Sequence, residues 1–191
     1  MRLAAVVTVA LITAVSINIL LYTAIHGNEK AAESVVRKAL LSLRDNDAQE
    51  LKLLLHSKSR DRYAMRKAGR FEKVVLYTRN SFQLQSESRE ALANSVVAVS
   101  GVSDDLIYDI LSRNLADYEC PADISEASPI VVRYTVGKAD MISIALMESG
   151  KWKVATTPLY MSANVLNYSS VSEAIEHNDA LVDPKEALPE H

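Results

Sequence analysis

The side chains that most often perform chemistry are few and scattered in this chain of 191 residues. The single cysteine has no sequence context for a nucleophile, and the four histidines show no metal-ligand spacing. The five glycines form no phosphate-binding loop. We therefore expect no metal site and no cofactor. The residues concerned are Cys120, His26, His56, His177 and His191.

Acid–base chemistry on a small apolar ligand is the enzymatic alternative. An isomerase or dehydratase cavity needs a general base together with a tyrosine or a protonated carboxylic acid as hydrogen-bond donor. These residue types are present, but a tyrosine on an apolar strand packs in a core far more often than it catalyses. We expect no catalytic residue. The residues weighed for this role are Tyr63, Tyr77, Tyr108, Tyr134 and Asp109.

The most distinctive polar feature is a basic cluster in residues 58–73, KSRDRYAMRKAGRFEK, which contain seven Lys or Arg side chains. Arg62, Arg66 and Arg70 recur at intervals of four and share one face of a helix. With Lys67 they form a candidate docking surface for lipid headgroups or an acidic partner. The alternative is a solvated face.

Charge is divided unevenly along the chain. Residues 28–80 carry 13 Lys or Arg against 7 Asp or Glu, whereas residues 81–191 carry 7 against 17. The basic cluster could therefore pair with the acidic second half, or one face of the domain could meet an anionic surface.

Residues 91–115 have the pattern of a DNA-binding helix-turn-helix, with Gly101 in the turn. The second helix would begin with Asp104 and Asp105 and continue to Asp109, and these carboxylates would repel phosphate. We do not expect nucleic acid as a partner.

The first residues decide the compartment. Residues 3–25 carry no charge and, as a helix, would reach about 35 Å, which matches a hydrocarbon core of about 30 Å. A cleaved signal peptide is the alternative, but a cut after Ser16 would leave an apolar new terminus. We expect residues 1–27 to stay as a transmembrane anchor. Arg2 favours a cytoplasmic N-terminus and an extracytoplasmic domain, periplasmic if the source is bacterial.

Apolar periodicity predicts the elements of the domain, residues 28–168. Apolar side chains recur at helical spacing over residues 29–44, which predicts a helix. A further helix is predicted over residues 59–69, and it ends at Gly69. Alternation over residues 71–88 predicts a strand, while residues 89–101 fit a helix or a strand. Three further segments complete the first part: a helix over 47–55, a helix capped by Ser103 over 104–115, and a loop over 120–129.

The strongest strand signals follow the loop. Residues 130–136, 141–147 and 152–161 are apolar runs separated by tight turns, which predicts an antiparallel meander. Pro158 predicts that the last strand is an edge or bends there. Residues 169–191 are polar and acidic, and we expect a flexible tail.

Residues 31–55 (AAESVVRKALLSLRDNDAQELKLLL) and 142–160 (ISIALMESGKWKVATTPLY) resemble the opening helix pair and the closing hairpin of the NTF2-like superfamily. The resemblance implies an α+β cone, with helices packed on a curved antiparallel sheet and Trp152 under the helices. Members of this superfamily include isomerases, dehydratases, transport factors and membrane-anchored assembly proteins, so the fold alone does not select a function.

These observations predict a single-pass membrane protein that contacts the bilayer through residues 3–25. Its extracytoplasmic α+β domain would be a non-catalytic binding or assembly module in an envelope complex, with protein partners or further copies of itself. The alternative is a cavity that binds, isomerises or dehydrates a small apolar ligand.

Overall fold

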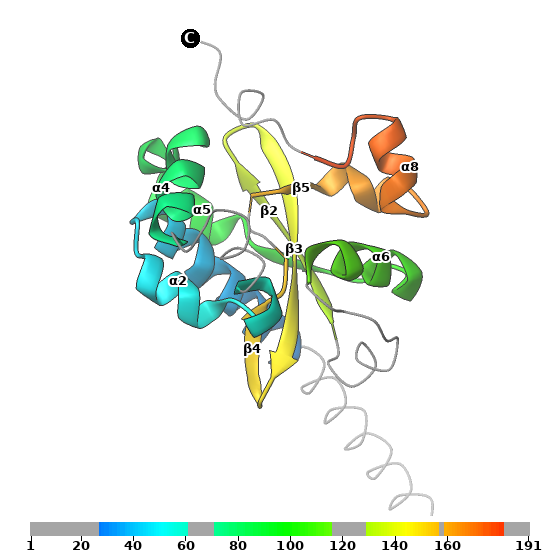
Figure 1. Cartoon of the computed structure of the whole chain (residues 1–191), viewed down its shortest axis with the longest axis horizontal. Coiled ribbons are helices and arrows are strands. Elements are labelled where there is room, and N and C mark those ends of the chain that lie inside the picture. The colour runs from blue at the N-terminus through cyan, green and yellow to red at the C-terminus, as the bar shows by residue number, and fades with distance from the viewer. Residues whose placement is uncertain (1–26, 61–70, 116–128, 157–158, 182–191) are drawn as a thin grey trace, which may run out of the picture.

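A five-stranded antiparallel sheet with helices on both faces forms the body of the protein (Figure 1). The structure is a computed structural model that describes residues 27–60, 71–115, 129–156 and 159–181. The α+β class is therefore confirmed. Residues 1–26, which contain the predicted anchor, lie outside this range, and no helix in the described ranges is long and apolar enough to cross a membrane.

The first two predicted helices are confirmed. Residues 27–44 form one helix, which buries an apolar side at intervals of three and four. Asp47 then caps α2 (Ala48–Leu54), because its carboxylate accepts the Glu50 backbone N–H at 2.9 Å. Residues 57–60 are helical, and the rest of the predicted third helix lies outside the described residues.

The strand predicted over residues 71–88 is wrong. These residues form α4 (Phe71–Ser81) and the short 3-10 helix η1 (Leu84–Ser86). Val75 is buried, whereas the neighbouring Leu76 and Tyr77 are exposed. One buried stripe is the pattern of a surface helix, and packing of that stripe outweighs the strand propensity of VVLY.

Residues 89–101 contain both structures that the sequence allowed. They form α5 (Arg89–Asn94), which Ser88 caps, and the strand β1 (Val97–Val99). The predicted Ser103 cap is confirmed at the start of α6 (Asp104–Asn114). Because β1 lies between the two helices, the helix-turn-helix arrangement of residues 91–115 is wrong.

The predicted meander is confirmed, with β3 at its centre. Strands β2 and β3 pair over seven residues, from Ile130 with Ala145 to Val136 with Ala139. β1 extends the sheet beyond β2, and β4 and β5 both pair with the other edge of β3. The bounds are β2 Ile130–Val136, β3 Ala139–Glu148, β4 Lys151–Val154 and β5 Met161–Ser162.

The single strand predicted over residues 152–161 is divided into β4 and β5. Between them the chain leaves β3, and the Thr156 hydroxyl accepts the Ile144 N–H at 3.0 Å. Leu159 then adopts a left-handed φ of 61°. Both β4 and β5 are edge strands of the sheet, which agrees with the edge position predicted for the last strand. Pro158 itself lies outside the described residues.

Two apolar clusters lie on opposite faces of the sheet, because successive side chains of a strand point to opposite faces. Val132, Tyr134 and Val136 of β2 pack with the helices 27–44, α2, α4 and α5. Val131, together with Ile142 and Ile144 of β3, packs with α6 on the other face. Trp152 packs against the first cluster.

The predicted flexible tail is wrong for residues 169–181. They follow the 3-10 helix η2 (Ala163–Asn167) and contain α8 (Val171–Glu176). Val171 and Ala174, three residues apart, are buried in the second cluster, and Leu181 pairs with Met161. Composition suggested disorder here, but the buried side chains and the bond from the Val171 N–H to Asp109 hold this segment against α6. Residues 182–191 lie outside the described residues.

The outer edge of β1 is covered by the first helix. The Glu33 carboxylate accepts the Ala98 N–H at 2.9 Å, and Arg37 donates to the Ala93 carbonyl at 2.7 Å. A covered edge cannot pair freely with another strand.

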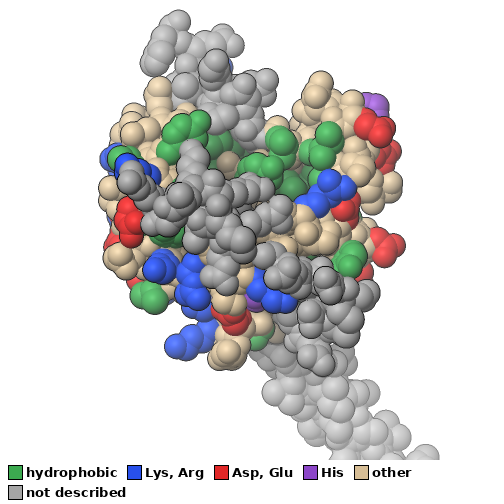
Figure 2. Space-filling model, in the orientation of Figure 1, with side chains coloured by type: hydrophobic (Ala, Val, Ile, Leu, Met, Phe, Trp, Pro, Cys, Tyr) green, Lys and Arg blue, Asp and Glu red, His purple; other side chains and the backbone are tan. Residues whose placement is uncertain are grey.

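On the surface, Lys and Arg side chains gather over α2 and the β3–β4 hairpin (Figure 2).

Candidate functional site

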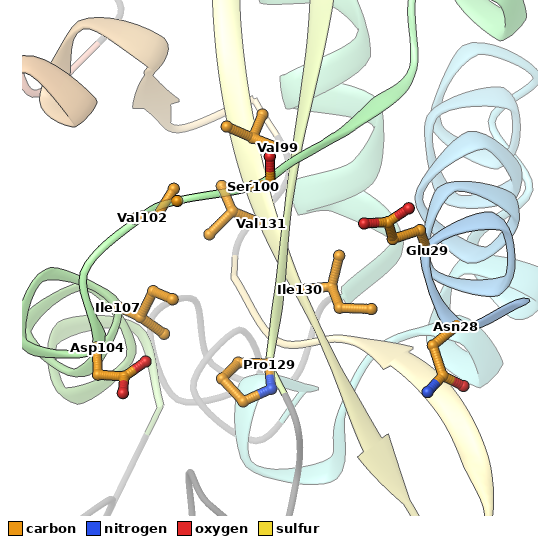
Figure 3. Close-up of a pocket in the computed structure, with 11 residues that line it drawn as sticks. Asn28, Glu29, Val99, Ser100, Val102, Asp104, Ile107, Pro129, Ile130 and Val131 are labelled. Carbon is orange, nitrogen blue, oxygen red and sulfur yellow. The ribbon is translucent and has the colours of Figure 1, made fainter. Parts of the chain in front are cut away.

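An open cleft of about 320 Å³ lies where the described chain begins (Figure 3). It is bordered by the start of the helix 27–44, by the segment from β1 to α6, and by the start of β2. Six of its eleven lining residues are apolar. They are Val99, Val102, Ile107, Pro129, Ile130 and Val131.

The register of the sheet explains why this cleft exists. Val99 is the last residue of β1 to pair with β2, and its partner is Val131. The chain then turns away through Gly101, whose φ of 78° favours glycine, and enters α6. Ile130 continues to pair with β3, so the cleft opens between β2 and the departing segment.

Two carboxylates border this apolar surface. Glu29 comes from the first helix and Asp104 from the first turn of α6, on opposite sides of the cleft in Figure 3. Asp104 is exposed, so its charge is solvated. An apolar cleft with acidic borders suits an apolar segment that carries a basic residue.

One of the tyrosines weighed for a catalytic role is a core residue. Tyr134 is fully buried, and burial raises the pKa of its hydroxyl. The hydroxyl accepts the Leu159 N–H at 3.0 Å and lies 3.2 Å from the Ser143 hydroxyl. These contacts hold the chain between β4 and β5, and they provide no general base.

The other residues weighed for catalysis have structural contacts or lie apart from one another. Asp109 bonds to Arg113 at 2.8 Å and to the Val171 N–H at 2.7 Å, and so joins α6 to α8. Tyr108 packs against the second cluster, and Tyr77 is exposed on α4. Tyr63 lies outside the described residues.

His56 and Glu148 form a structural cluster that the sequence did not reveal. The Glu148 carboxylate accepts the Ser57 backbone N–H at 3.2 Å and also bonds to the Ser57 hydroxyl. His56 Nε2 lies 3.7 Å from the same carboxylate, and His56 Nδ1 accepts the Lys58 N–H at 3.3 Å. Glu148 thus caps the helical residues 57–60 from β3, 91 positions away.

The titration of this cluster follows from its burial. Burial lowers the pKa of His56 below its ordinary value, and the charges of Lys58 and Lys153 lower it further, against the opposing effect of Glu148. Burial raises the pKa of Glu148, but its bonds to Ser57 outweigh burial and the pKa is lowered. At neutral pH the cluster therefore holds a neutral imidazole beside a carboxylate.

A second, polar cleft of about 300 Å³ lies at the β2–β3 turn, where Lys138 and Asp140 face the segment after α8. Asp179 borders it and accepts a hydrogen bond from Tyr168, which raises the pKa of that hydroxyl. A tyrosine that holds its proton more tightly is a poorer acid.

The predicted docking residues cannot be placed, because Arg62, Arg66, Lys67 and Arg70 lie outside the described residues, as do Cys120, His26 and His191. His177 ends α8 and stacks on Tyr168 at 5.4 Å. In the described ranges, no three His, Cys, Asp or Glu side chains are grouped as metal ligands would be.

Sequence reasoning missed the apolar cleft. Its side chains come from three segments up to 103 positions apart, between Asn28 and Val131, and each segment alone reads as ordinary core. The available signals were Gly101, after an apolar run, and Pro129, before another. Comparison with protein-family models, curated proteins and solved structures finds no match for the chain.

Proposed function

We propose that this chain is a single-pass membrane protein whose extracytoplasmic α+β domain is a non-catalytic binding or assembly module in an envelope complex. The observation that carries the proposal is the apolar cleft beside Asn28 and Glu29. It opens where the domain meets the predicted anchor, so a partner in the same membrane could reach it.

Binding is favoured over turnover because the candidate catalytic groups hold the structure together. The Tyr134 hydroxyl stabilises the chain between β4 and β5, and Asp109 joins α6 to α8. The NTF2-like assignment is part of this proposal. It is supported by the opening helix pair and by the hairpin on which Trp152 packs against the helical cluster.

The partner we infer is an apolar protein segment with a basic residue. The apolar surface of the cleft would bury aliphatic side chains, and the exposed carboxylate of Asp104 would attract a Lys or Arg. A rim charge of this kind guides association and register more than it adds affinity.

The test is affinity purification of the full chain from detergent-solubilised membranes, with two matched variants. Val102→Glu places a charge in the cleft, whereas Val97→Glu places one on β1, where the side chain is already 49% exposed and does not line the cleft. We expect a reproducible set of envelope proteins with the wild type and with Val97→Glu, and its loss with Val102→Glu. Equal recovery with both variants would contradict the proposed site.

The side of the membrane needs a separate measurement. An alkaline phosphatase fused to the C-terminus is active only outside the cytoplasm, so activity is the expected result. An inactive phosphatase, together with an active cytoplasmic reporter at the same position, would reverse the proposed orientation.

A further inference from the structure

A group of lysines lies at one end of the sheet, on α2, on the helical residues 57–60 and on the β3–β4 hairpin. We propose that this lysine surface, defined as Lys52, Lys58, Lys151 and Lys153, rests on the anionic lipid headgroups of the bilayer. The inference rests on the proposed membrane anchor and assigns a lipid-binding surface to the domain itself.

Contacts place these lysines together. Lys153 donates from its ammonium group to the Leu53 carbonyl, which joins β4 to α2. The chain after α2 continues along β4, since Leu55 pairs with Val154 and the His56 N–H donates to the Val154 carbonyl at 2.9 Å. Lys58 follows directly, and Lys151 begins β4.

Two described carboxylates lie near these lysines and offset only part of their charge. Glu148 is half-buried and lies opposite Lys151 in the β3–β4 register, and its carboxylate bonds to Ser57 and lies beside His56. Glu50 is two residues before Lys52 on α2, so the two side chains point about 160° apart around the helix axis. Among the described residues, four ammonium groups therefore lie near two carboxylates, and the exposed lysine side chains are those of Lys52 and Lys151.

An exposed leucine lies among the lysines. Leu53 is 63% exposed and follows Lys52 on α2, while Leu51 of the same helix is fully buried. Lysines around an exposed aliphatic side chain are the composition of surfaces that lie in the headgroup region, where the apolar group enters the boundary and the ammonium groups remain at the phosphates.

The register of the sheet puts this surface at the membrane end of the domain. Ile130 pairs with Ala145, and β3 then runs on to Glu148 and the hairpin. Asn28 and Glu29 border the cleft together with Pro129 and Ile130, so the described chain begins at the same end of the sheet. Both the hairpin and the start of the helix 27–44 therefore face the bilayer if residues 3–25 span it.

The experiment uses the full chain in vesicles, with a fluorophore on a single cysteine and a quencher on the lipid headgroup. Cys120→Ser removes the native thiol, and Leu53→Cys places the probe on the lysine surface. Ile175→Cys is the matched control, because Ile175 is 45% exposed on α8. The residues just after α8 border the β2–β3 turn, at the opposite end of β3, and a strand of ten residues spans about 33 Å.

In vesicles that contain phosphatidylglycerol we expect headgroup quenching at position 53 and little at position 175. Quenching at position 53 should fall in phosphatidylcholine alone and at high salt, because screening weakens exposed charges. Replacing Lys52 and Lys151 with Gln should lower the fraction of docked domain, with a loss of about fivefold in the docking equilibrium for each lysine, and Arg at both positions should restore it.

Three results would overturn the proposal. They are equal quenching at both positions, no effect of the Gln variants, and a probe at position 53 that is covered in native membranes but not in lipid vesicles. The last would assign the surface to an acidic protein. Carbonate extraction separates this inference from the proposed function. A chain that resists extraction but shows no quenching at position 53 keeps its anchor and lacks the lipid surface, whereas a chain that is extracted loses the anchor proposal itself.

Discussion

Replacing Tyr134 with Phe should destabilise the domain without leaving a cavity. The ring stays in place, so the loss comes from the hydroxyl, which accepts the Leu159 N–H and contacts the Ser143 hydroxyl. A neutral hydrogen bond contributes about 1 kcal/mol net, and a buried donor left without an acceptor costs about 1–3 kcal/mol. Tyr134 and Ser143 are fully buried, so water cannot replace the hydroxyl.

We therefore expect Tyr134→Phe to lower the free energy of unfolding by about 2–3 kcal/mol, which corresponds to a fall in Tm of about 4–12 °C for a domain of this size. Urea unfolding of the full chain in detergent can be followed by the fluorescence of Trp152, the only tryptophan. Ser143→Ala removes one contact and leaves the Leu159 acceptor, so it should cost about 1 kcal/mol.

The double variant provides the sharpest check. Because Tyr134 and Ser143 share one contact, their effects should not add, and the combined loss should be smaller than the sum by about 0.5–1 kcal/mol. A loss below about 0.5 kcal/mol for Tyr134→Phe would refute the structural role of the hydroxyl. Such a result, if an activity on a small ligand also disappeared, would favour the enzymatic alternative.

Three further outcomes follow from contacts described above. Thr156→Val should cost about 1–3 kcal/mol in urea unfolding because the Ile144 N–H loses its acceptor, while Thr156→Ser should keep most of the stability. The pKa of His56 is lowered in the folded chain, so the unfolded chain binds the proton at a higher pH than the folded chain does. The free energy of unfolding should therefore fall as the pH decreases from about 6.5 through the folded pKa. His56→Gln should remove this part of the pH dependence. Glu33→Ala should uncover the Ala98 N–H on the edge of β1 and increase self-association in size-exclusion chromatography with light scattering, whereas Glu33→Gln should stay like the wild type because it keeps an acceptor.

Local patterns predicted those elements whose local and long-range preferences agree. Asp47 and Ser103 cap helices as expected, and the tight turns of the meander set its register. Residues 71–81 show the opposite case. Their β-branched and aromatic side chains favour a strand, but the contacts of Phe71 and Val75 with the helical cluster give a helix.

The site was less predictable than the fold because it depends on distances in space. The cap that Glu148 provides to Ser57 joins positions 91 residues apart, and no local pattern signals it. The cleft likewise requires knowing that β1 stops pairing at Val99 while β2 continues to Ile130. The basic cluster of residues 58–73 shares Lys58 with the proposed lysine surface, but the lysines of the hairpin are far from it in sequence.

The central position of β3 has a consequence for the order of events on the ribosome. This strand pairs with β2, β4 and β5, so its last partner, Met161–Ser162, is made after every other strand. Glu33 of the first helix finds its contact at Ala98, 65 positions later. At usual rates of about 5–20 residues per second, Glu33 would wait several seconds for this contact. The sheet would therefore be completed only after residues 161–162 have left the ribosome.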